Sequence, residues 1–86
     1  FKVNLFPNPL VDEKLTVEFD LKEKVSVSYI ITNTKGQIIQ ESKFNNLKAG
    51  KNKQSIHIQK GDLRQALNLT FIFDNRYYSS HKFVVQ

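Results

Sequence analysis

The two histidines, His57 and His81, are the side chains best suited to acid–base chemistry near neutral pH. His57 stands between Ile56 and Ile58, so the alternation of a β-strand directs it to solvent when those isoleucines are buried. His81 occupies a similar mixed segment, and neither histidine has a carboxylate pattern beside it in the sequence. We therefore interpret both as surface residues without a catalytic or metal-binding role.

The acidic residues offer two further places for chemistry. Asp12 and Glu13 are adjacent, but their loop lacks the glycine and the spaced oxygens of a calcium loop, so we interpret it as a solvated turn. Glu18 and Asp20 share one strand face as exposed neighbours, without the apolar pocket of a catalytic acid. Phosphate-binding, nucleophile-elbow and zinc motifs are absent, and so is cysteine. The sequence predicts a protein that is not an enzyme, with no catalytic residues, no metal site and no cofactor.

Tyr77 and Tyr78 follow Arg76 and could form an aromatic sugar platform or an interface. Consecutive strand residues point to opposite faces, so only one tyrosine can be exposed on a given face, which favours core packing with a rim contact. Asn68-Leu69-Thr70 matches a glycosylation sequon, but a strand interior is a poor acceptor site.

The formal net charge of +5 comes from eleven lysines and two arginines against eight acidic residues. Nucleic-acid-binding proteins usually use arginine and a concentrated basic stripe. Here the lysines are interleaved with acids, as in Lys22-Glu23-Lys24, so we predict no nucleic-acid partner. No apolar run approaches the roughly 20 residues that cross a bilayer, so we expect no direct membrane insertion.

Apolar residues recur at every second position along most of the chain, which is typical of half-buried β-strands. Gly36 and Gly50 mark two connections, with Gly50 at the tip of a loop over residues 47–52. One helical turn capped by Asp62 is expected over residues 62–66. The candidate strands are residues 3–6, 15–21, 25–31, 37–44, 54–59, 69–73 and 77–85.

These segments predict an all-β fold, a seven-stranded antiparallel immunoglobulin-like β-sandwich that forms a single domain over residues 1–86. Ile38 and Ile39 are expected on opposite faces of an irregular strand. Because Phe1 is not an initiator methionine, we expect a mature fragment of a longer protein. The expected core is Leu15, Val17, Phe19, Val27, Tyr29, Ile31, Ile56, Ile58, Leu69, Phe71 and Phe73.

The segment Leu5-Phe6-Pro7-Asn8-Pro9 gives the chain a rigid exit from its first strand. Pro7 and Pro9 each fix φ near −65° and donate no backbone N–H, so the strand that begins at Val3 must stop there. Asn8 precedes a proline and is therefore held in extended geometry.

This opening resembles that of a type IX secretion C-terminal sorting domain, the Por secretion system family. Three later segments are similar to that family in the same order: the hairpin over residues 25–39, the Leu-x-x-Gly-x-Asn loop over residues 47–52, and the closing Lys82-Phe83-Val84-Val85. The chain departs from the family in lacking its Gly-x-Tyr element before the penultimate strand. The residues that the resemblance implies for recognition are Pro7, Asn8, Pro9, Gly36, Gly50, Lys82, Phe83, Val84 and Val85.

The resemblance implies a non-catalytic C-terminal signal of a larger cargo from the phylum Bacteroidota. Such a domain passes through the periplasm to the outer-membrane surface or is secreted. Its partners are protein components of the secretion and attachment machinery: a translocon, a shuttle and a sortase-like peptidase. Open sheet edges also allow weak self-association.

Two alternatives remain open at this point. The first is a retained adaptor domain within the surface-attachment machinery, which the missing Gly-x-Tyr element would also fit. The second is an immunoglobulin-like carbohydrate-binding or spacer module of a secreted protein. A sugar-binding module would need a row of outward aromatic side chains, and a spacer would not carry the proline motif.

Overall fold

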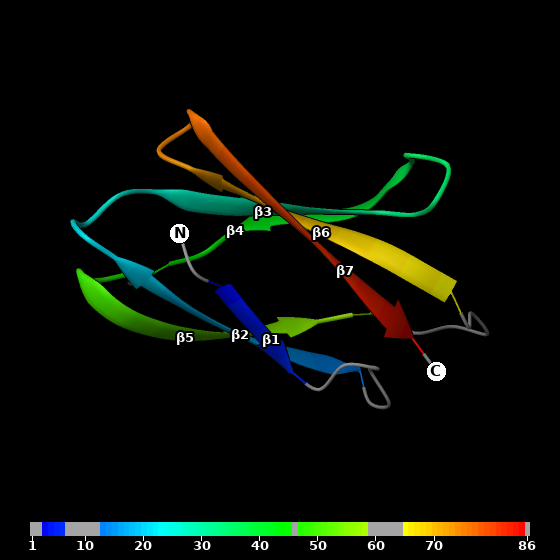
Figure 1. Ribbon diagram of the computed structural model, residues 1–86, viewed down its shortest axis with the longest axis horizontal. Helices are drawn as coiled ribbons and strands as arrows, with labels where there is room; N and C mark the ends of the chain where they lie inside the picture. The colour runs from blue at the N-terminus through cyan, green and yellow to red at the C-terminus, as the bar shows by residue number, and fades with distance from the viewer. Residues whose placement is uncertain (1–2, 7–12, 46, 59–64, 86) are drawn as a thin grey trace.

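The strands form two stacked antiparallel sheets (Figure 1). The computed structural model describes residues 3–6, 13–45, 47–58 and 65–85. A three-stranded sheet has the order β1 (Val3–Phe6), β2 (Lys14–Leu21), β5 (Gly50–His57). A four-stranded sheet has the order β4 (Ile38–Lys43), β3 (Val27–Thr32), β6 (Gln65–Phe73), β7 (Tyr77–Val85). This arrangement confirms the predicted seven-stranded immunoglobulin-like sandwich.

The position of β4 distinguishes this sandwich from a constant-type immunoglobulin domain. There the fourth strand lies in the same sheet as the fifth, whereas here β4 pairs with β3. The chain therefore crosses between the sheets on its way from β4 to β5. Gln40 links the sheets at this side, because its Nε2 donates to the His57 carbonyl at 2.8 Å and to the Tyr29 hydroxyl at 3.1 Å.

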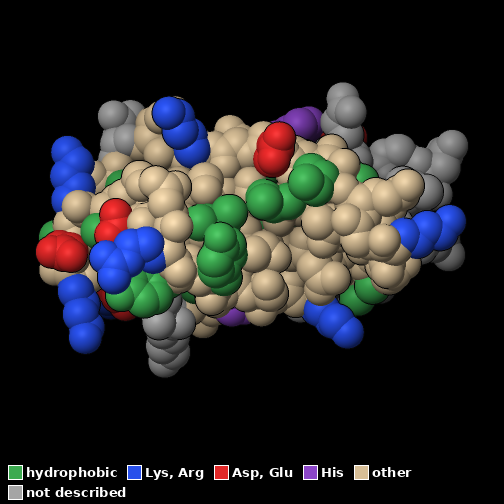
Figure 2. Space-filling view, turned by 90° about the horizontal axis from the view of Figure 1, so that it is seen from above, with side chains coloured by type: hydrophobic (Ala, Val, Ile, Leu, Met, Phe, Trp, Pro, Cys, Tyr) green, Lys and Arg blue, Asp and Glu red, His purple; other side chains and the backbone are tan. Residues whose placement is uncertain are grey.

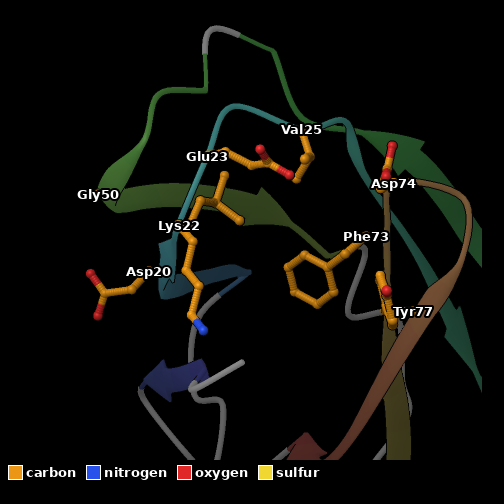
Figure 3. A pocket seen from close by; sticks show the side chains of 9 residues that line it. Asp20, Lys22, Glu23, Val25, Gly50, Phe73, Asp74 and Tyr77 are labelled. Atoms are coloured by element: carbon orange, nitrogen blue, oxygen red, sulfur yellow. The ribbon is translucent and has the colours of Figure 1, made fainter.

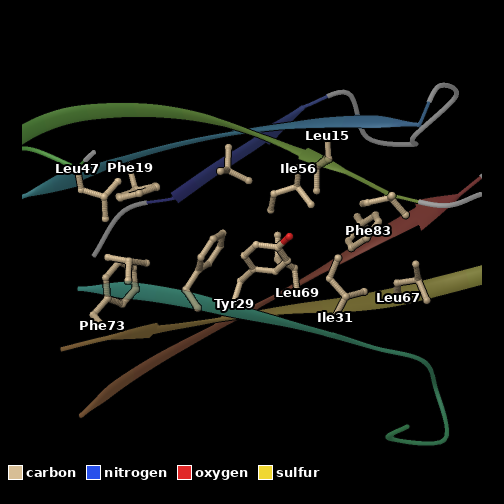
Figure 4. Close-up of a cluster of buried hydrophobic side chains, with 14 of the residues drawn as sticks. Leu15, Phe19, Tyr29, Ile31, Leu47, Ile56, Leu67, Leu69, Phe73 and Phe83 are labelled. Carbon is tan, nitrogen blue, oxygen red and sulfur yellow. The ribbon is translucent and has the colours of Figure 1, made fainter. Parts of the chain in front are cut away.

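The core lies between the sheets and contains the inward residues of alternating strands (Figure 4). All eleven residues predicted for the core are buried, none of them more than 7% exposed. Phe71 lies among aromatic rings, with the centroids of Phe19, Phe44 and Phe73 each 6.1 Å from its own. Five more side chains complete the core: Leu21, Leu47, Leu67, Phe83 and Val85.

Two tight turns close the hairpins of the four-stranded sheet. Between β3 and β4, Gly36 adopts a φ of 81°, the left-handed geometry predicted for it, and its N–H donates to the Asn33 carbonyl at 3.0 Å. Between β6 and β7, Asp74 and Asn75 both have a φ of 54°, as a type I′ turn requires. The short polar side chains of aspartate and asparagine tolerate this geometry better than most residues do.

Several boundaries differ from the predicted ones. The strand β6 begins at Gln65, so the last two residues of the expected helical turn lie in a strand, where Gln65 and Ala66 pair with Val85 and Val84. The rest of that turn, residues 62–64, lies outside the described residues, as do Pro7, Asn8 and Pro9. Pairing with β2 extends β5 back to Gly50, which starts the strand instead of forming a loop tip.

The prediction that Tyr77 and Tyr78 favour core packing is wrong. Tyr77 and Tyr78 are both exposed, at 53% and 70%, so neither packs in the core. Both residues lie at the start of β7, next to the β6–β7 turn. The irregular strand predicted around Ile38 and Ile39 is confirmed, because the register of β4 shifts between the partners of Ile31 and Thr32. Both isoleucines are exposed there.

Candidate recognition surface

The predicted recognition residues that the structure describes lie at two ends of the sandwich (Figure 1). The end of β1, the turn with Gly36 and the closing segment of β7 share one end, since Thr32, Asn68 and Lys82 stand in one row across three strands. Gly50 lies at the other end, opposite Leu21 of β2. The structure therefore does not bring these residues together into a single site.

The closing strand alternates between the core and the surface. Phe83 and Val85 are buried, and Phe83 pairs with Leu67 of β6. Lys82 and Val84 point outward from the same strand and are exposed. Only Lys82 and Val84 therefore present their side chains to a partner, while Phe83 and Val85 hold the strand in register.

The Leu47–Asn52 segment is organised by Asn52, which sequence reasoning had not singled out. Asn52 is 5% exposed and faces inward from β5. Its Oδ1 accepts from the Lys48 N–H at 3.1 Å, and its Nδ2 donates to the carbonyls of Lys48 and Gly50 at 2.8 and 3.1 Å. Leu47 anchors the segment in the core, and Gly50 turns it with a φ of 95°. The motif is thus a structural loop that is held by hydrogen bonds from its own asparagine. The presence of Asn52 in the motif is the sequence feature that could have indicated this role.

Asn33 plays a comparable part in the turn around Gly36. Its Oδ1 accepts from the backbone N–H groups of Lys35 and Gln37, at 2.9 and 3.0 Å. Its Nδ2 also donates to Oε1 of Gln37 at 2.9 Å. The turn is therefore fixed locally, before any partner is bound.

The histidines divide between surface and interior. His57 is exposed, as predicted, but the fold places its Nε2 3.5 Å from Oε2 of Glu13, a neighbour that the sequence pattern did not reveal. His81 is half-buried, so its prediction as a surface residue is wrong. Its Nε2 lies 2.8 Å from the Ser79 hydroxyl, its ring meets Phe71 edge-on at 5.8 Å, and partial burial lowers the pKa of its imidazole.

The Ser79–His81 contact has the distance of a nucleophile–base pair. A hydrolase would also need a third group to orient the imidazole and donors for an oxyanion, and no such arrangement occurs among the described residues. The described residues also contain no group of three or more histidines, cysteines or carboxylates that could hold a metal ion. We find no residue set there for a cofactor.

A cleft of about 600 Å³ opens at the end of the sandwich that carries Gly50 (Figure 3). Leu21, Val25 and Phe73 supply apolar side chains to it, and Tyr77 stands at one side. Its charged residues, Asp20, Lys22, Glu23 and Asp74, are all exposed at the rim. The cleft therefore offers no buried acid or base for catalysis.

Comparison with known proteins identifies the family. The model of the secretion system C-terminal sorting domain matches residues 4–86, which is all but the first three residues of the chain. The chain belongs to this sorting-domain family. No curated protein matches the chain.

Membership confirms the resemblance to type IX secretion sorting domains and assigns the domain to a secreted or cell-surface cargo protein. The family is not known as catalytic. In this sorting domain β6 forms without the usual Gly-x-Tyr element, because Leu67, Leu69 and Phe71 supply its inward side chains. No helix in the described parts of the chain is long and apolar enough to span a membrane.

Proposed function

We propose that this sorting domain acts, in its folded form, as an export signal. Components of the type IX secretion and attachment machinery dock onto it and recognise it while the protein passes through the periplasm to the cell surface. The family match over residues 4–86 is the observation that carries this proposal. The structure supports it, because the described loops and the closing strand are fixed by their own contacts. Asn33 and Asn52 each form hydrogen bonds within their own loop, and buried Phe83 and Val85 anchor β7. A partner can then bind without a large cost of ordering them.

The closing strand is central to the proposed mechanism. Its outward Lys82 and Val84 keep a fixed position only while Phe83 and Val85 fill the core. A slip of one residue would exchange the two pairs between surface and core. Docking is therefore expected to depend on an intact closing strand in its native register.

A fusion experiment tests the proposal. The domain is joined to a fluorescent reporter that carries a signal peptide, in a bacterium with a type IX system, and surface delivery is measured. The intact fusion is expected at the surface, and deletion of residues 82–86 is expected to leave the reporter in the periplasm. His57→Ala, which changes an exposed side chain, is the control and should not affect export.

Retention of the intact fusion in the periplasm would contradict the proposal that the domain is an export signal for a fused protein. The retained-adaptor function would then be favoured, and outer-membrane partners of the domain would be sought by pull-down. Delivery of the deleted fusion at the intact rate would instead contradict the role of the closing strand.

A further inference from the structure

The outer face of the three-stranded sheet carries residues of opposite charge that face each other across its strands. Glu18 of β2 stands directly opposite Lys53 of β5, and Asp20 stands opposite Lys51. Nζ of Lys53 also lies 5.8 Å from the ring centroid of exposed Phe6. A partner that covered this face would have to remove water from two opposite-charge pairs, which is costly.

The outer face of the four-stranded sheet has a different character (Figure 2). Uncharged and hydrophobic side chains cover most of its middle, and the charged ones lie mainly towards its ends and borders. We call it the uncharged face after six uncharged residues that the strand registers place on it: Ile30, Ile38, Thr70, Ile72, Tyr78 and Ser80. The registers place Glu41, Lys43 and Lys82 on the same side, along the two edge strands.

The polar groups on the uncharged face are partly satisfied by one another. The hydroxyls of Thr70 and Ser80 lie 2.9 Å apart and form a hydrogen bond across β6 and β7. Ile30 and Ile72 are half-buried beside them, while Tyr78 and Ile38 are largely exposed. Covering this face would therefore bury apolar surface at a small cost in lost hydration.

The described charges around the uncharged face are predominantly basic. Lys43 and Lys82 lie on its two edge strands, and Lys35 and Arg76 lie in the turns at its two ends. Glu41 and Asp74 are the acidic residues in the same border. The border thus carries a net positive charge, in keeping with the +5 of the whole chain. A surface with carboxylates around an uncharged centre is its electrostatic complement.

We propose that the uncharged face is the surface through which this sorting domain binds its machinery, and that the partner is a protein whose docking surface is uncharged in the middle and bordered by carboxylates. This inference rests on the proposed function. Tyr78 is the expected anchor, because it is 70% exposed and large aromatic side chains are enriched among the residues that contribute most to binding. Ile38 supplies apolar contact on the opposite edge strand.

The same reporter fusion tests the face with single carboxylate substitutions. Tyr78→Asp and Ile38→Asp place a negative charge on the uncharged face, against the carboxylates of the partner. Ser55→Asp adds the same charge to the outer face of the three-stranded sheet, where Ser55 is exposed and lies outside the predicted recognition segments. Surface delivery is expected to fall about tenfold in the first two variants and to stay within about twofold of the intact fusion in the third. Equal thermal melts of the three purified variants establish that each is folded.

A photo-crosslinking amino acid placed at position 78 or at position 55 identifies the class of partner. An adduct with another protein is expected from position 78, not from position 55, and it should be lost when Ile38→Asp is added. An adduct with a second copy of the fusion or with lipopolysaccharide would overturn the proposal.

The outcomes separate the face from the function. If the intact fusion is not delivered, the proposed function as an export signal is contradicted, and so is the assignment of the uncharged face that rests on it. If the intact fusion is delivered and Tyr78→Asp and Ile38→Asp are delivered equally well, only the assignment of the face is overturned.

Discussion

Asn52 provides the most direct test of how the loop before β5 is held. Its amide makes three hydrogen bonds to the backbone, of 3.1, 2.8 and 3.1 Å, and the side chain is 5% exposed. Each such bond contributes a net 0.5–1.5 kcal/mol, roughly, and part of the backbone of Lys48 can regain water in a variant. We therefore expect Asn52→Ala to lower the free energy of unfolding by about 2–3 kcal/mol.

That loss is a large fraction of the total for a domain of 86 residues, which is about 4–13 kcal/mol. At about 4–8 °C per kcal/mol for a domain of this size, the midpoint of thermal unfolding should fall by about 10–20 °C. Circular dichroism during heating and urea titration both measure the change. Asn52→Asp should be at least as damaging at neutral pH, because it keeps the acceptor but turns a carboxylate oxygen towards two backbone carbonyls.

Gln54→Ala is the matched control for this prediction. Gln54 lies two residues along β5, is half-buried, and makes no side-chain hydrogen bond in the described part of the chain. Its removal should lower the melting midpoint by only a few degrees. A melting midpoint for Asn52→Ala within about 2 °C of the parent would refute the reasoning that Asn52 holds the loop.

Three further predictions concern stability. Phe71→Ala should lower the free energy of unfolding by about 3–5 kcal/mol in urea titration, because it empties the centre of the aromatic cluster, whereas Ile72→Ala on the outer face should cost less. Gly36→Ala should lower it by roughly 1–2 kcal/mol for its left-handed φ alone, since no atom lies within 4 Å of the added Cβ; an unchanged urea midpoint would contradict this. Burial lowers the pKa of His81, so near the ordinary histidine value of about 6.5 the unfolded chain binds more protons than the folded one. The contribution of His81 to the free energy of unfolding should therefore be fully present above that pH and be lost as the pH falls below it. Urea midpoints measured at successive pH values should depend less on pH in His81→Asn than in the parent.

The alternation of apolar residues was sufficient to predict the strands and most of the core. A side chain at every second position can be shielded from water on one face of a sheet only, so residues such as Val17, Phe19 and Phe71 had to face inward. Strand ends were predicted less well, because they depend on pairing. Gly50 and Gln65 lie in strands because β2 and β7 offer them backbone partners, and no local pattern marks such partners.

Family membership was predicted from the sequence, but the arrangement of the family's segments in space was not. The order of the opening prolines, the hairpin, the loop and the closing strand was enough to indicate the family, since each segment carries local residues that fix a turn or a strand. The contacts between segments could not be read in the same way. The link from Gln40 to the His57 carbonyl joins the two stacked sheets. The partnership of His57 with Glu13 and the contact of His81 with Phe71 instead depend on which strands pair within each sheet.

The sequence by itself thus determined the fold class, the inward set of side chains and membership of the sorting-domain family, because periodicity and turn chemistry act over a few residues. Tertiary structure alone decided that β4 joins β3 and that Asn52 bonds its own loop. It also decided that one outer face carries charged residues across its strands, whereas the other carries them on its edge strands. These properties depend on which strands become neighbours and in what register. A shift of one residue in that register would exchange the faces of every side chain in the strand.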